Sequence, residues 1–377
     1  MTQDLATPHV SSVDIEMMQR AIRLARKGRY STRPNPKVGC VIVANGHVVG
    51  EGYHIKAGGP HAEVHALAQA ADKAQGACAY VTLEPCSHFG RTPPCAQALI
   101  DAKVSKVVVA MVDPNPQVAG KGIAMLQQAG IEVVTGVLQT QARALNPGFF
   151  KRMETGLPYV RVKLAATLDG KTALANGESK WITGPQARTD VQDWRALSCA
   201  VITGRGTVQR DNPSLTVRPQ QWAAYGRDLQ QLSQLQAPLR VVLDRQAKLT
   251  PSIQMAQDKQ PLLLVSQQDY RCQWPDWVKT EQLSQSDPDD LKQLLELLAK
   301  QGINEVLVEA GATLAGAFVQ QQLVDELILY QAPKLIGNDG RDLLKHDALS
   351  RMEQVSLLTC IESRQFGVDT RLILKRD

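Results

Sequence analysis

Runs of β-branched and aliphatic residues alternate with amphipathic stretches along most of the chain, and this alternation limits the possible folds most strongly. In the first part, two such runs flank an Asn45-Gly46 turn and predict a β-hairpin. The pattern then predicts helices over residues 14–29, 61–71, 95–102 and 122–129, and strands over 78–83, 104–111 and 131–134. Strands alternating with helices predict a layered α/β domain.

A second α/β pattern follows a break at Asn146-Pro-Gly and Gly156-Leu-Pro158. We therefore expect two α/β domains, over residues 1–150 and 151–377. The second pattern predicts strands over residues 159–164, 199–203, 239–243, 262–265, 305–309 and 326–330, and helices over 290–300 and from Thr313. The polar stretches 220–236 and 280–289 are predicted to be surface loops.

Composition excludes several classes of protein. With 44% hydrophobic and 21% charged residues, the chain is neither disordered nor fibrous. The apolar runs are too short to cross a membrane, and the N-terminus lacks the features of a secretory signal, so we expect a cytoplasmic protein without a membrane partner. A net charge of +5 without a block of like charges argues against nucleic acid and fits a small anionic substrate. Seven cysteines argue against a disulfide framework.

The strongest functional signal is a set of possible zinc ligands next to prolines. His61 follows Pro60, and Cys86 and Cys95 follow Pro85 and Pro94. One histidine and two cysteines can hold Zn²⁺ and leave a fourth position for water, whose pKa the metal lowers to about 7. Glu63 is then the general acid and base that moves the proton. Because proline favours the first turn of a helix, we expect the ligands at helix N-termini.

Other interpretations of these residues exist. Each ligand taken alone would more often be a packing residue. His61 and His65 have the spacing of a metalloprotease helix, but Ala62 stands where that motif needs glutamate. We expect His65 to support the site or pack, and His88 to lie in an exposed loop. The sequence assigns no role to His54.

Four segments resemble the cytidine and tRNA-adenosine deaminase superfamily: Val38-Gly-Cys-Val-Ile-Val, Gly50-Glu-Gly-Tyr, His61-Ala-Glu-Val-His-Ala-Leu and Tyr80-Val-Thr-Leu-Glu-Pro-Cys. Most members have two residues between the cysteines, whereas here eight separate them. This insert and Arg33-Pro-Asn-Pro-Lys-Val-Gly resemble the deaminase half of the bifunctional riboflavin-biosynthesis deaminase–reductases.

The resemblance implies a cytidine-deaminase-like, three-layer α/β/α domain that deaminates 2,5-diamino-6-(5-phosphoribosylamino)pyrimidin-4(3H)-one at carbon 2. Asn35 would donate a hydrogen bond to the pyrimidine edge, although an ordinary Asn-Pro turn is an alternative. The backbone carbonyl of Glu84 would accept a hydrogen bond from the departing amine, as in similar deaminases.

The second half carries two glycine-rich turns, Thr203-Gly-Arg-Gly-Thr207 and residues 309–317, which alone are as consistent with tight packing as with phosphate binding. Segments 163–171, 177–183, 211–218 and 308–311 resemble the reductase half of the same family. This resemblance implies a dihydrofolate-reductase-like α/β domain that reduces the ribosyl group of 5-amino-6-(5-phosphoribosylamino)uracil with NADPH.

The matching motifs also imply which residues form the reductase site. The resemblance places NADPH against Ala165, Trp181, Thr207, Asp211 and the segment Gly311, Ala312, Thr313, Leu314, Ala315, Gly316 and Ala317. It places the substrate against Lys163, Ser179, Arg195, Leu215, Arg218 and Glu309, whose basic members suit a sugar phosphate. Asn212 stands where the family often has aspartate, and Arg245 stands where smaller polar residues are common.

We therefore predict a bifunctional enzyme with Zn²⁺ and NADPH as cofactors, a small-molecule phosphoribosyl-pyrimidine substrate and a homo-oligomeric state. Alternatives are a zinc nucleobase deaminase with a non-catalytic second domain, a nucleic-acid-editing deaminase and a closed structural zinc module. A closed module needs a fourth protein ligand, and a nucleic-acid editor needs a basic face and short cysteine spacing.

Overall fold

A computed structural model describes residues 10–87, 93–116, 118–218, 221, 235–284 and 290–376. The chain divides into two compact units, Met1–Thr155 and Gly156–Asp377, and each is described by itself. None of the helices in the described ranges combines the length and the apolar character that a membrane crossing requires.

Unit 1 is built on a five-stranded sheet in the order β2-β1-β3-β4-β5. Its strands are β1 (Gly39–Ala44), β2 (His47–Tyr53), β3 (Cys78–Val81), β4 (Lys106–Val109) and β5 (Glu132–Thr135). The hairpin strands β2 and β1 are antiparallel, as are β1 and β3. In contrast, β3, β4 and β5 run parallel, so the loops after these strands leave the same edge of the sheet.

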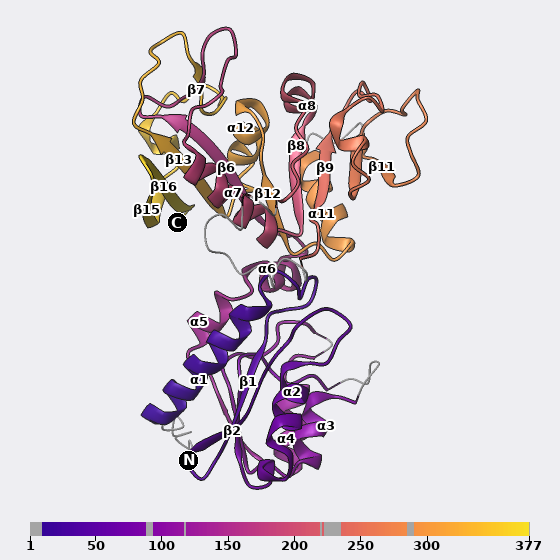
Figure 1. The fold of residues 1–377 in the computed structure, drawn as a ribbon, viewed down its shortest axis with the longest axis vertical. Coiled ribbons are helices and arrows are strands. Elements are labelled where there is room, and N and C mark those ends of the chain that lie inside the picture. The colour runs from indigo at the N-terminus through magenta and orange to yellow at the C-terminus, as the bar shows by residue number, and fades with distance from the viewer. Residues whose placement is uncertain are drawn as a thin grey trace. The chain divides into compact units, whose positions relative to one another are not determined.

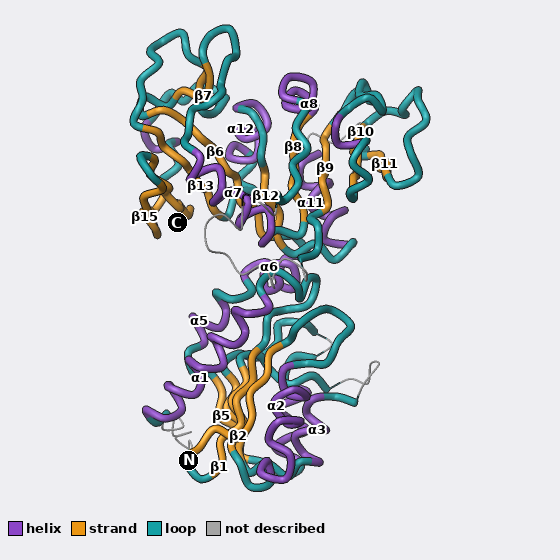
Figure 2. The backbone as a smooth tube through the Cα atoms, in the orientation of Figure 1, coloured by secondary structure: helices purple, strands orange, loops and turns teal. Residues whose placement is uncertain are grey.

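Helices cover both faces of this sheet (Figures 1 and 2). They are α1 (Ser12–Ala25), α2 (Ala62–Ala70), α3 (Cys95–Asp101), α4 (Lys121–Gln128), α5 (Gln139–Arg143) and α6 (Pro147–Thr155), with 3-10 turns at Arg26–Gly28 and Ala71–Ala74. Along β1, Val41 and Val43 face the core beneath α1, whereas Cys40 and Ile42 face the core beneath α2 and α3. The predicted three-layer α/β/α architecture is confirmed.

Helix α2 lies directly on strand β2 because two glycines leave room for it. A Cβ atom at Gly50 would lie 2.1 Å from the Ala66 carbonyl oxygen, and one at Gly52 would lie 2.2 Å from that of Ala62. Any side chain at either position would push the helix away from the strand. The glycines therefore fix the position of α2, whose first turn carries Glu63.

Unit 2 is built on a nine-stranded sheet in the order β11-β10-β9-β8-β12-β6-β13-β16-β15, with a separate β14-β7 pair. Its strands are β6 (Tyr159–Thr167), β7 (Lys171–Ala173), β8 (Ala200–Gly204), β9 (Leu239–Leu243), β10 (Leu262–Ser266), β11 (Val278–Gln282), β12 (Glu305–Val308), β13 (Glu326–Ala332), β14 (Arg341–Asp342), β15 (Leu358–Phe366) and β16 (Asp369–Arg376). The strands from β11 to β13 pair in parallel, and β16 pairs antiparallel with both β13 and β15.

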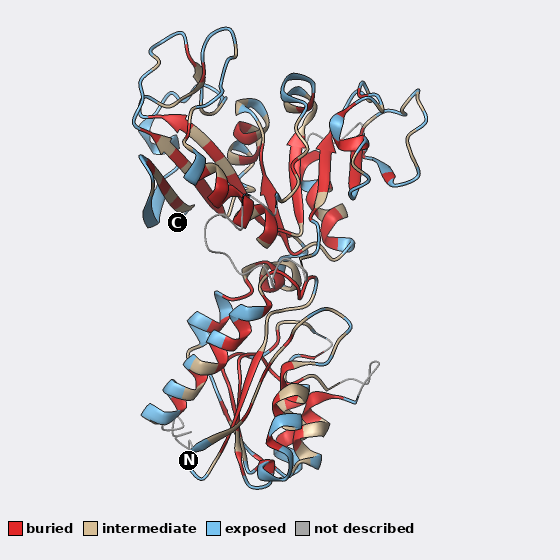
Figure 3. Ribbon diagram, in the orientation of Figure 1, coloured by how far each residue is buried: buried red, intermediate tan, exposed pale blue. Residues whose placement is uncertain are grey.

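Helices again cover both faces of this sheet, whose central strands are buried (Figure 3). They are α7 (Pro185–Leu197), α8 (Arg205–Asp211), α11 (Asp290–Lys300) and α12 (Ala312–Gln320), with 3-10 turns at Gln254–Ala256 and Met352–Gln354. Leu291, Leu295 and Phe318 from α11 and α12 pack on one face. Ala187 and Val191 from α7 pack on the other.

One prediction about unit 2 needs correction. Residues 280–282, predicted to be loop, belong to the edge strand β11. The residues of this strand after Val278 are exposed and mostly polar, so its sequence resembles that of a loop. Residues 285–289 and most of the predicted loop 220–236 lie outside the described residues. In addition, the sequence did not predict α7, whose buried positions include Asp190, Gln192 and Arg195.

A buried arginine anchors the loops beside the predicted substrate residues of unit 2. Arg240 on β9 is 1% exposed. Its guanidinium group donates to both oxygens of Asp258 at 2.7 and 2.8 Å and to the carbonyl of Ser214 at 3.1 Å. It also donates to the carbonyls of Met255 and Gln260 at 3.0 and 2.7 Å. Arg240 therefore fixes the backbone next to Leu215.

We expect Arg240→Met to lower the free energy of unfolding of unit 2 by about 3–5 kcal/mol, because it leaves the Asp258 carboxylate and several carbonyls without their donor. Denaturant unfolding, monitored by the tryptophans of unit 2, measures this loss. Arg351→Met is the control, since Arg351 pairs with Glu353 on the surface and its removal should cost less than about 0.5 kcal/mol. Equal losses for both variants would contradict the prediction.

Candidate active sites

The three predicted zinc ligands of unit 1 converge at the ends of three elements. His61 is the N-cap residue of α2, and Cys95 is the first residue of α3. Cys86 lies a few residues beyond the end of β3. The prolines thus mark helix starts as predicted, and the side chains of His61, Cys86 and Cys95 place their ligand atoms within 4.8 Å of one another.

The distances within this cluster suit a tetrahedral zinc ion. His61 Nδ1 lies 3.6 Å from Cys86 Sγ and 3.3 Å from Cys95 Sγ. With metal–ligand bonds of about 2.0–2.3 Å and tetrahedral angles, a nitrogen and a sulfur on one zinc lie about 3.6 Å apart. Hydrogen bonding with Cys95, together with that from His61, lowers the pKa of the Cys86 thiol, which favours the thiolate that a metal binds.

Glu63 projects into the same site from the first turn of α2. It is 3% exposed, and its Oε2 atom has no hydrogen-bond partner in the described structure. Burial raises the pKa of its carboxyl group to about 7, so both protonation states are accessible near neutral pH. A buried carboxylate oxygen without a partner suits a proton carrier that meets water or substrate.

His54, which had no role from sequence, orients Asn35. Its Nδ1 lies 3.1 Å from the Pro60 carbonyl oxygen, and its Nε2 lies 3.1 Å from Asn35 Nδ2. A carbonyl can only accept, so Nδ1 carries the proton, and burial lowers the pKa of His54 and keeps the ring neutral. Nε2 must then accept from the Asn35 amide, which fixes how that amide is turned. In the sequence, His54 stands between Gly50-Glu-Gly52 and Gly58-Gly59, which was the only local feature that pointed to it.

Two further histidines, His65 and His88, were considered from the sequence. His65 is half-buried on α2, and its Nε2 atom has no partner in the part of the chain that the structure describes. His88 lies outside the described residues.

In unit 2, the predicted cofactor residues lie mostly at the carboxyl ends of three neighbouring strands. Ala165 is near the end of β6, and Thr207 and Asp211 are on α8 directly after β8. Gly311 is the N-cap of α12, which follows β12. Gly311 and Thr313 are exposed, Ala312 and Leu314 are half-buried, and Ala315, Gly316 and Ala317 continue into the body of the helix.

Two of these residues pack inside the unit. Ala315 belongs to the core, and a Cβ atom at Gly316 would lie 1.8 Å from the Lys345 carbonyl oxygen. Only the first turn of α12 is therefore open to a ligand.

Trp181 lies with its indole 61% exposed. The Arg188 guanidinium stacks 4.1 Å from the ring centroid, and Lys334 Nζ donates to the Trp181 carbonyl at 2.8 Å. An exposed aromatic ring that is held on one side suits contact with a flat ligand.

Four predicted substrate residues gather around a buried ion pair. Arg195 donates to Glu309 through Nε at 2.5 Å and Nη2 at 2.9 Å. Burial alone would raise the pKa of Glu309, but the charges of Arg195, Lys163 and Arg218 lower it overall. Burial lowers the pKa of Lys163, whose ammonium group has no hydrogen-bond partner among the described residues. Lys163 and the exposed Arg218 thus add positive charge beside the ion pair.

The remaining predicted residues of unit 2 have different environments, and Leu215 adjoins Thr216, whose carbonyl accepts from Arg195 Nη1 at 3.0 Å. Ser179 is exposed in the loop before α7, whereas Leu215 is buried in the core with a positive φ of 50°. Asn212 has a structural role, because its Oδ1 accepts from the Gln254 N–H at 2.8 Å. Arg245 pairs with Asp290 at the start of α11.

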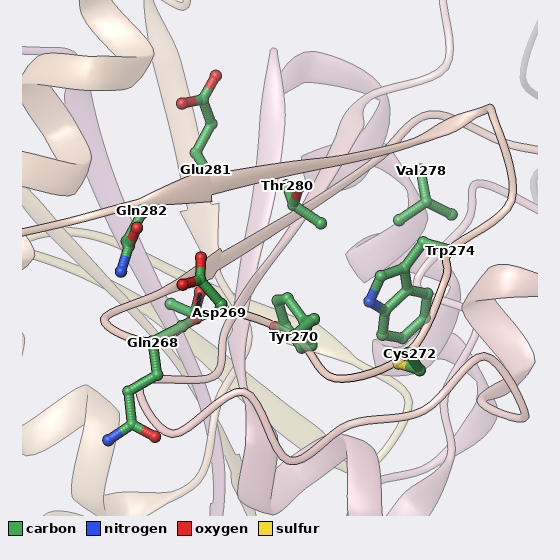
Figure 4. A pocket seen from close by; sticks show the side chains of 10 residues that line it. Gln268, Asp269, Tyr270, Cys272, Trp274, Val278, Thr280, Glu281 and Gln282 are labelled. Carbon is green, nitrogen blue, oxygen red and sulfur yellow. Dashed lines mark hydrogen bonds between the residues drawn. The ribbon is translucent and has the colours of Figure 1, made fainter.

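A cavity of about 400 Å³ lies elsewhere in unit 2, beside β10 and β11 (Figure 4). Tyr270 and Trp274 line it and meet edge to face, with ring centroids 5.4 Å apart. None of the predicted site residues lines this cavity.

Comparison with protein families assigns each unit to a class. Residues 11–111 match the cytidine and deoxycytidylate deaminase zinc-binding region, and residues 158–372 match the RibD C-terminal domain. Fold and site therefore define a chain that joins a zinc-binding deaminase domain to a reductase domain.

Full-length relatives make the assignment specific. The riboflavin biosynthesis protein RibD of Escherichia coli is 51% identical over 95% of this chain and 98% of its own length, and that of Haemophilus influenzae is 50% identical over 96% and 97%. The chain belongs to the RibD family and is a bifunctional enzyme of riboflavin biosynthesis with deaminase and reductase activities.

Solved structures of full-length relatives agree with this family assignment. Acinetobacter baumannii RibD, form 1, has a TM-score of 0.89 at 49% identity and covers 97% of this chain and 99% of its own. The diaminohydroxyphosphoribosylaminopyrimidine deaminase/5-amino-6-(5-phosphoribosylamino)uracil reductase from Thermotoga maritima has a TM-score of 0.85 at 32% identity, with the same coverage. The mixed α/β fold predicted for both domains is confirmed.

We expect His54→Leu to lower the free energy of unfolding of unit 1 by about 1–3 kcal/mol, because it leaves the Pro60 carbonyl and the Asn35 amide without partners. Thermal and denaturant unfolding measure this loss, and the KM for deamination should rise because Asn35 can turn. His65→Leu is the control, since its Nε2 atom has no hydrogen-bond partner among the described residues. A His54→Leu protein as stable as His65→Leu would contradict the assignment.

Proposed function

We propose that residues 1–150 deaminate 2,5-diamino-6-(5-phosphoribosylamino)pyrimidin-4(3H)-one with zinc held by His61, Cys86 and Cys95. The convergence of these three ligand atoms beside a buried glutamate is the observation that carries the proposal. Three protein ligands leave one tetrahedral position open, which is typical of catalytic rather than structural zinc. When bound, zinc supplies Lewis-acid activation of a water molecule.

The chain's own residues move protons and orient the ring. Glu63 Oε2, buried and without a hydrogen-bond partner among the described residues, accepts the proton of the attacking water and returns it to the leaving nitrogen. Asn35, turned by His54, presents its remaining polar atoms to the pyrimidine edge. The Glu84 carbonyl accepts from the departing amine.

For residues 151–377 we propose reduction of the ribosyl group of 5-amino-6-(5-phosphoribosylamino)uracil, with NADPH supplying the hydride. Parallel sheets bind ligands at the carboxyl ends of their strands, where Ala165, Thr207, Asp211 and the first turn of α12 lie. Helix N-termini such as that at Gly311 favour phosphate. The exposed face of Trp181 offers a surface for the nicotinamide ring.

The residues around the ion pair of Arg195 and Glu309 would contact the substrate in the reductase site. Glu309 is held ionised and accepts from sugar hydroxyl groups, while Lys163 and Arg218 add positive charge for the phosphate. Ser179 and Leu215 complete the proposed contacts. We also propose that the enzyme works in the cytoplasm as a homo-oligomer.

Mass spectrometry of the proposed substrate after incubation with purified enzyme tests both activities. Without NADPH we expect replacement of one amino group by oxygen, and with NADPH a further gain of two hydrogens. Deamination alone, with NADPH present, would support the alternative of a nucleobase deaminase with a non-catalytic second domain. No change with zinc-loaded enzyme would refute the proposed substrate.

For the zinc site, we expect Cys86→Ser to lose zinc and deamination, because a serine hydroxyl is a poor zinc ligand. Glu63→Gln should instead keep zinc and lose deamination by at least about a hundredfold, the scale of general acid–base catalysis. Metal analysis together with deamination rates separates the two roles. Loss of zinc in Glu63→Gln, or full zinc in Cys86→Ser, would overturn the respective assignment.

For the reductase site, we expect Lys163→Met to keep or raise the melting temperature of unit 2, because it removes a desolvated cation that has no hydrogen-bond partner among the described residues. Reduction should fall at least tenfold, while deamination in the same chain is unchanged. Calorimetry measures the melting temperature of unit 2, and separate assays measure the rates of reduction and of deamination. A destabilised variant with normal reduction would show that Lys163 is structural.

A further inference from the structure

Helix α4 begins without a capping residue of its own. Its N-cap is Gly120, which has a left-handed conformation with φ of 76° and no side chain to accept a hydrogen bond. The first helical residue is Lys121, whose positive charge lies at the positive end of the helix dipole. The N–H groups of a first helical turn need acceptors from elsewhere.

Glu84, from the loop after β3, supplies those acceptors. Its Oε1 accepts from the N–H groups of Gly122 at 2.9 Å and Ile123 at 3.3 Å. Its Oε2 accepts from Gly120 at 3.0 Å and Asp113 at 3.1 Å. A carboxylate has about four acceptor positions, so these bonds saturate the group. Glu84 is 4% exposed, and unlike Glu63 it has both carboxylate oxygens occupied by backbone N–H groups.

The same contact reaches the zinc site. A Cβ atom at Gly122 would lie 1.9 Å from the Pro85 carbonyl oxygen, so the first turn of α4 touches the backbone directly before Cys86. On its other side, Cys86 is joined to α3, because its carbonyl accepts from Ala96 at 3.1 Å and its sulfur accepts from the Cys95 N–H at 3.3 Å. Cys86 is thus held between the starts of two helices.

We infer that Glu84 is a positioning residue of the deaminase: by capping α4 from the neighbouring loop, its carboxylate holds Cys86 where its sulfur meets His61 and Cys95. This inference rests on the proposed role of Cys86 as a zinc ligand. It assigns a function to the Glu84 side chain, in addition to the proposed hydrogen bond of its backbone carbonyl.

Substitutions of Glu84 distinguish positioning from general stability. Glutamine has the same shape but replaces one oxygen with an NH₂ donor, which then faces N–H groups of the α4 turn. Aspartate keeps all the acceptor positions on a shorter stem. Glu132→Gln is the matched control, because Glu132 pairs with Lys106 on the surface of β5. Reduction of 5-amino-6-(5-phosphoribosylamino)uracil by the same chain reports whether unit 2 is intact, and the far-UV circular dichroism and melting of the variant report on unit 1.

We expect Glu84→Gln to lower zinc affinity, measured by competition with a chromogenic chelator, and kcat/KM for deamination by about 10–100-fold each, the usual effect of removing support for a metal ligand. The thiolate-to-cobalt absorption of the cobalt-substituted enzyme should shift, and Glu84→Asp should recover part of each loss. Reduction and the Glu132→Gln variant should stay within about twofold of the parent.

Unchanged zinc affinity, cobalt spectrum and deamination in Glu84→Gln would overturn the inference, even if its unit 1 melted earlier. If Glu84→Gln does not fold, the cobalt spectrum of Glu84→Asp decides, and a spectrum identical to the parent would also overturn it. Absence of zinc binding or deamination in the parent enzyme would instead refute the proposed function, so the two failures can be told apart.

Discussion

In both units the strands that carry predicted site residues pair in parallel, and the loops that follow these strands therefore leave the sheet at one edge. In unit 1 this brings the loop after β3, with Cys86, next to the loop after β4, which leads into α4. In unit 2 it brings the ends of β8, β12 and β6 together. Strand direction thus collects residues that are far apart in sequence.

The zinc cluster could be predicted because its signal is local. Each ligand stands beside a proline, and Pro60 and Pro94 mark helix starts in the structure as in the sequence. The alternating pattern likewise predicted the five strands of unit 1 and, in unit 2, β6, β8, β9, β10, β12 and β13, but not β15 or β16. It predicted helices α1 to α4, α11 and α12 but not α5 to α8. Where hydrophobic periodicity determines an element, as in α11, the sequence is sufficient to find it.

Elements whose buried side is charged could not be found this way. Helix α7 faces the interior with Asp190 and Arg195, which pair with Arg371 and Glu309 from distant strands and loops. Such a helix lacks an apolar stripe, and its partners become visible only in three dimensions. The roles of His54 and of the Glu84 side chain were hidden for the same reason, since each depends on a backbone group that the fold brings close.

The two cysteines, whose eight-residue spacing is unusual in the wider deaminase superfamily, are each held at the start of a helix. Cys86 is fixed by the end of β3 and by α4, and Cys95 is fixed by the start of α3. The hydrogen bond from the Cys95 N–H to the Cys86 sulfur joins the two positions directly. The described contacts that hold the two cysteines thus come from the starts of α3 and α4.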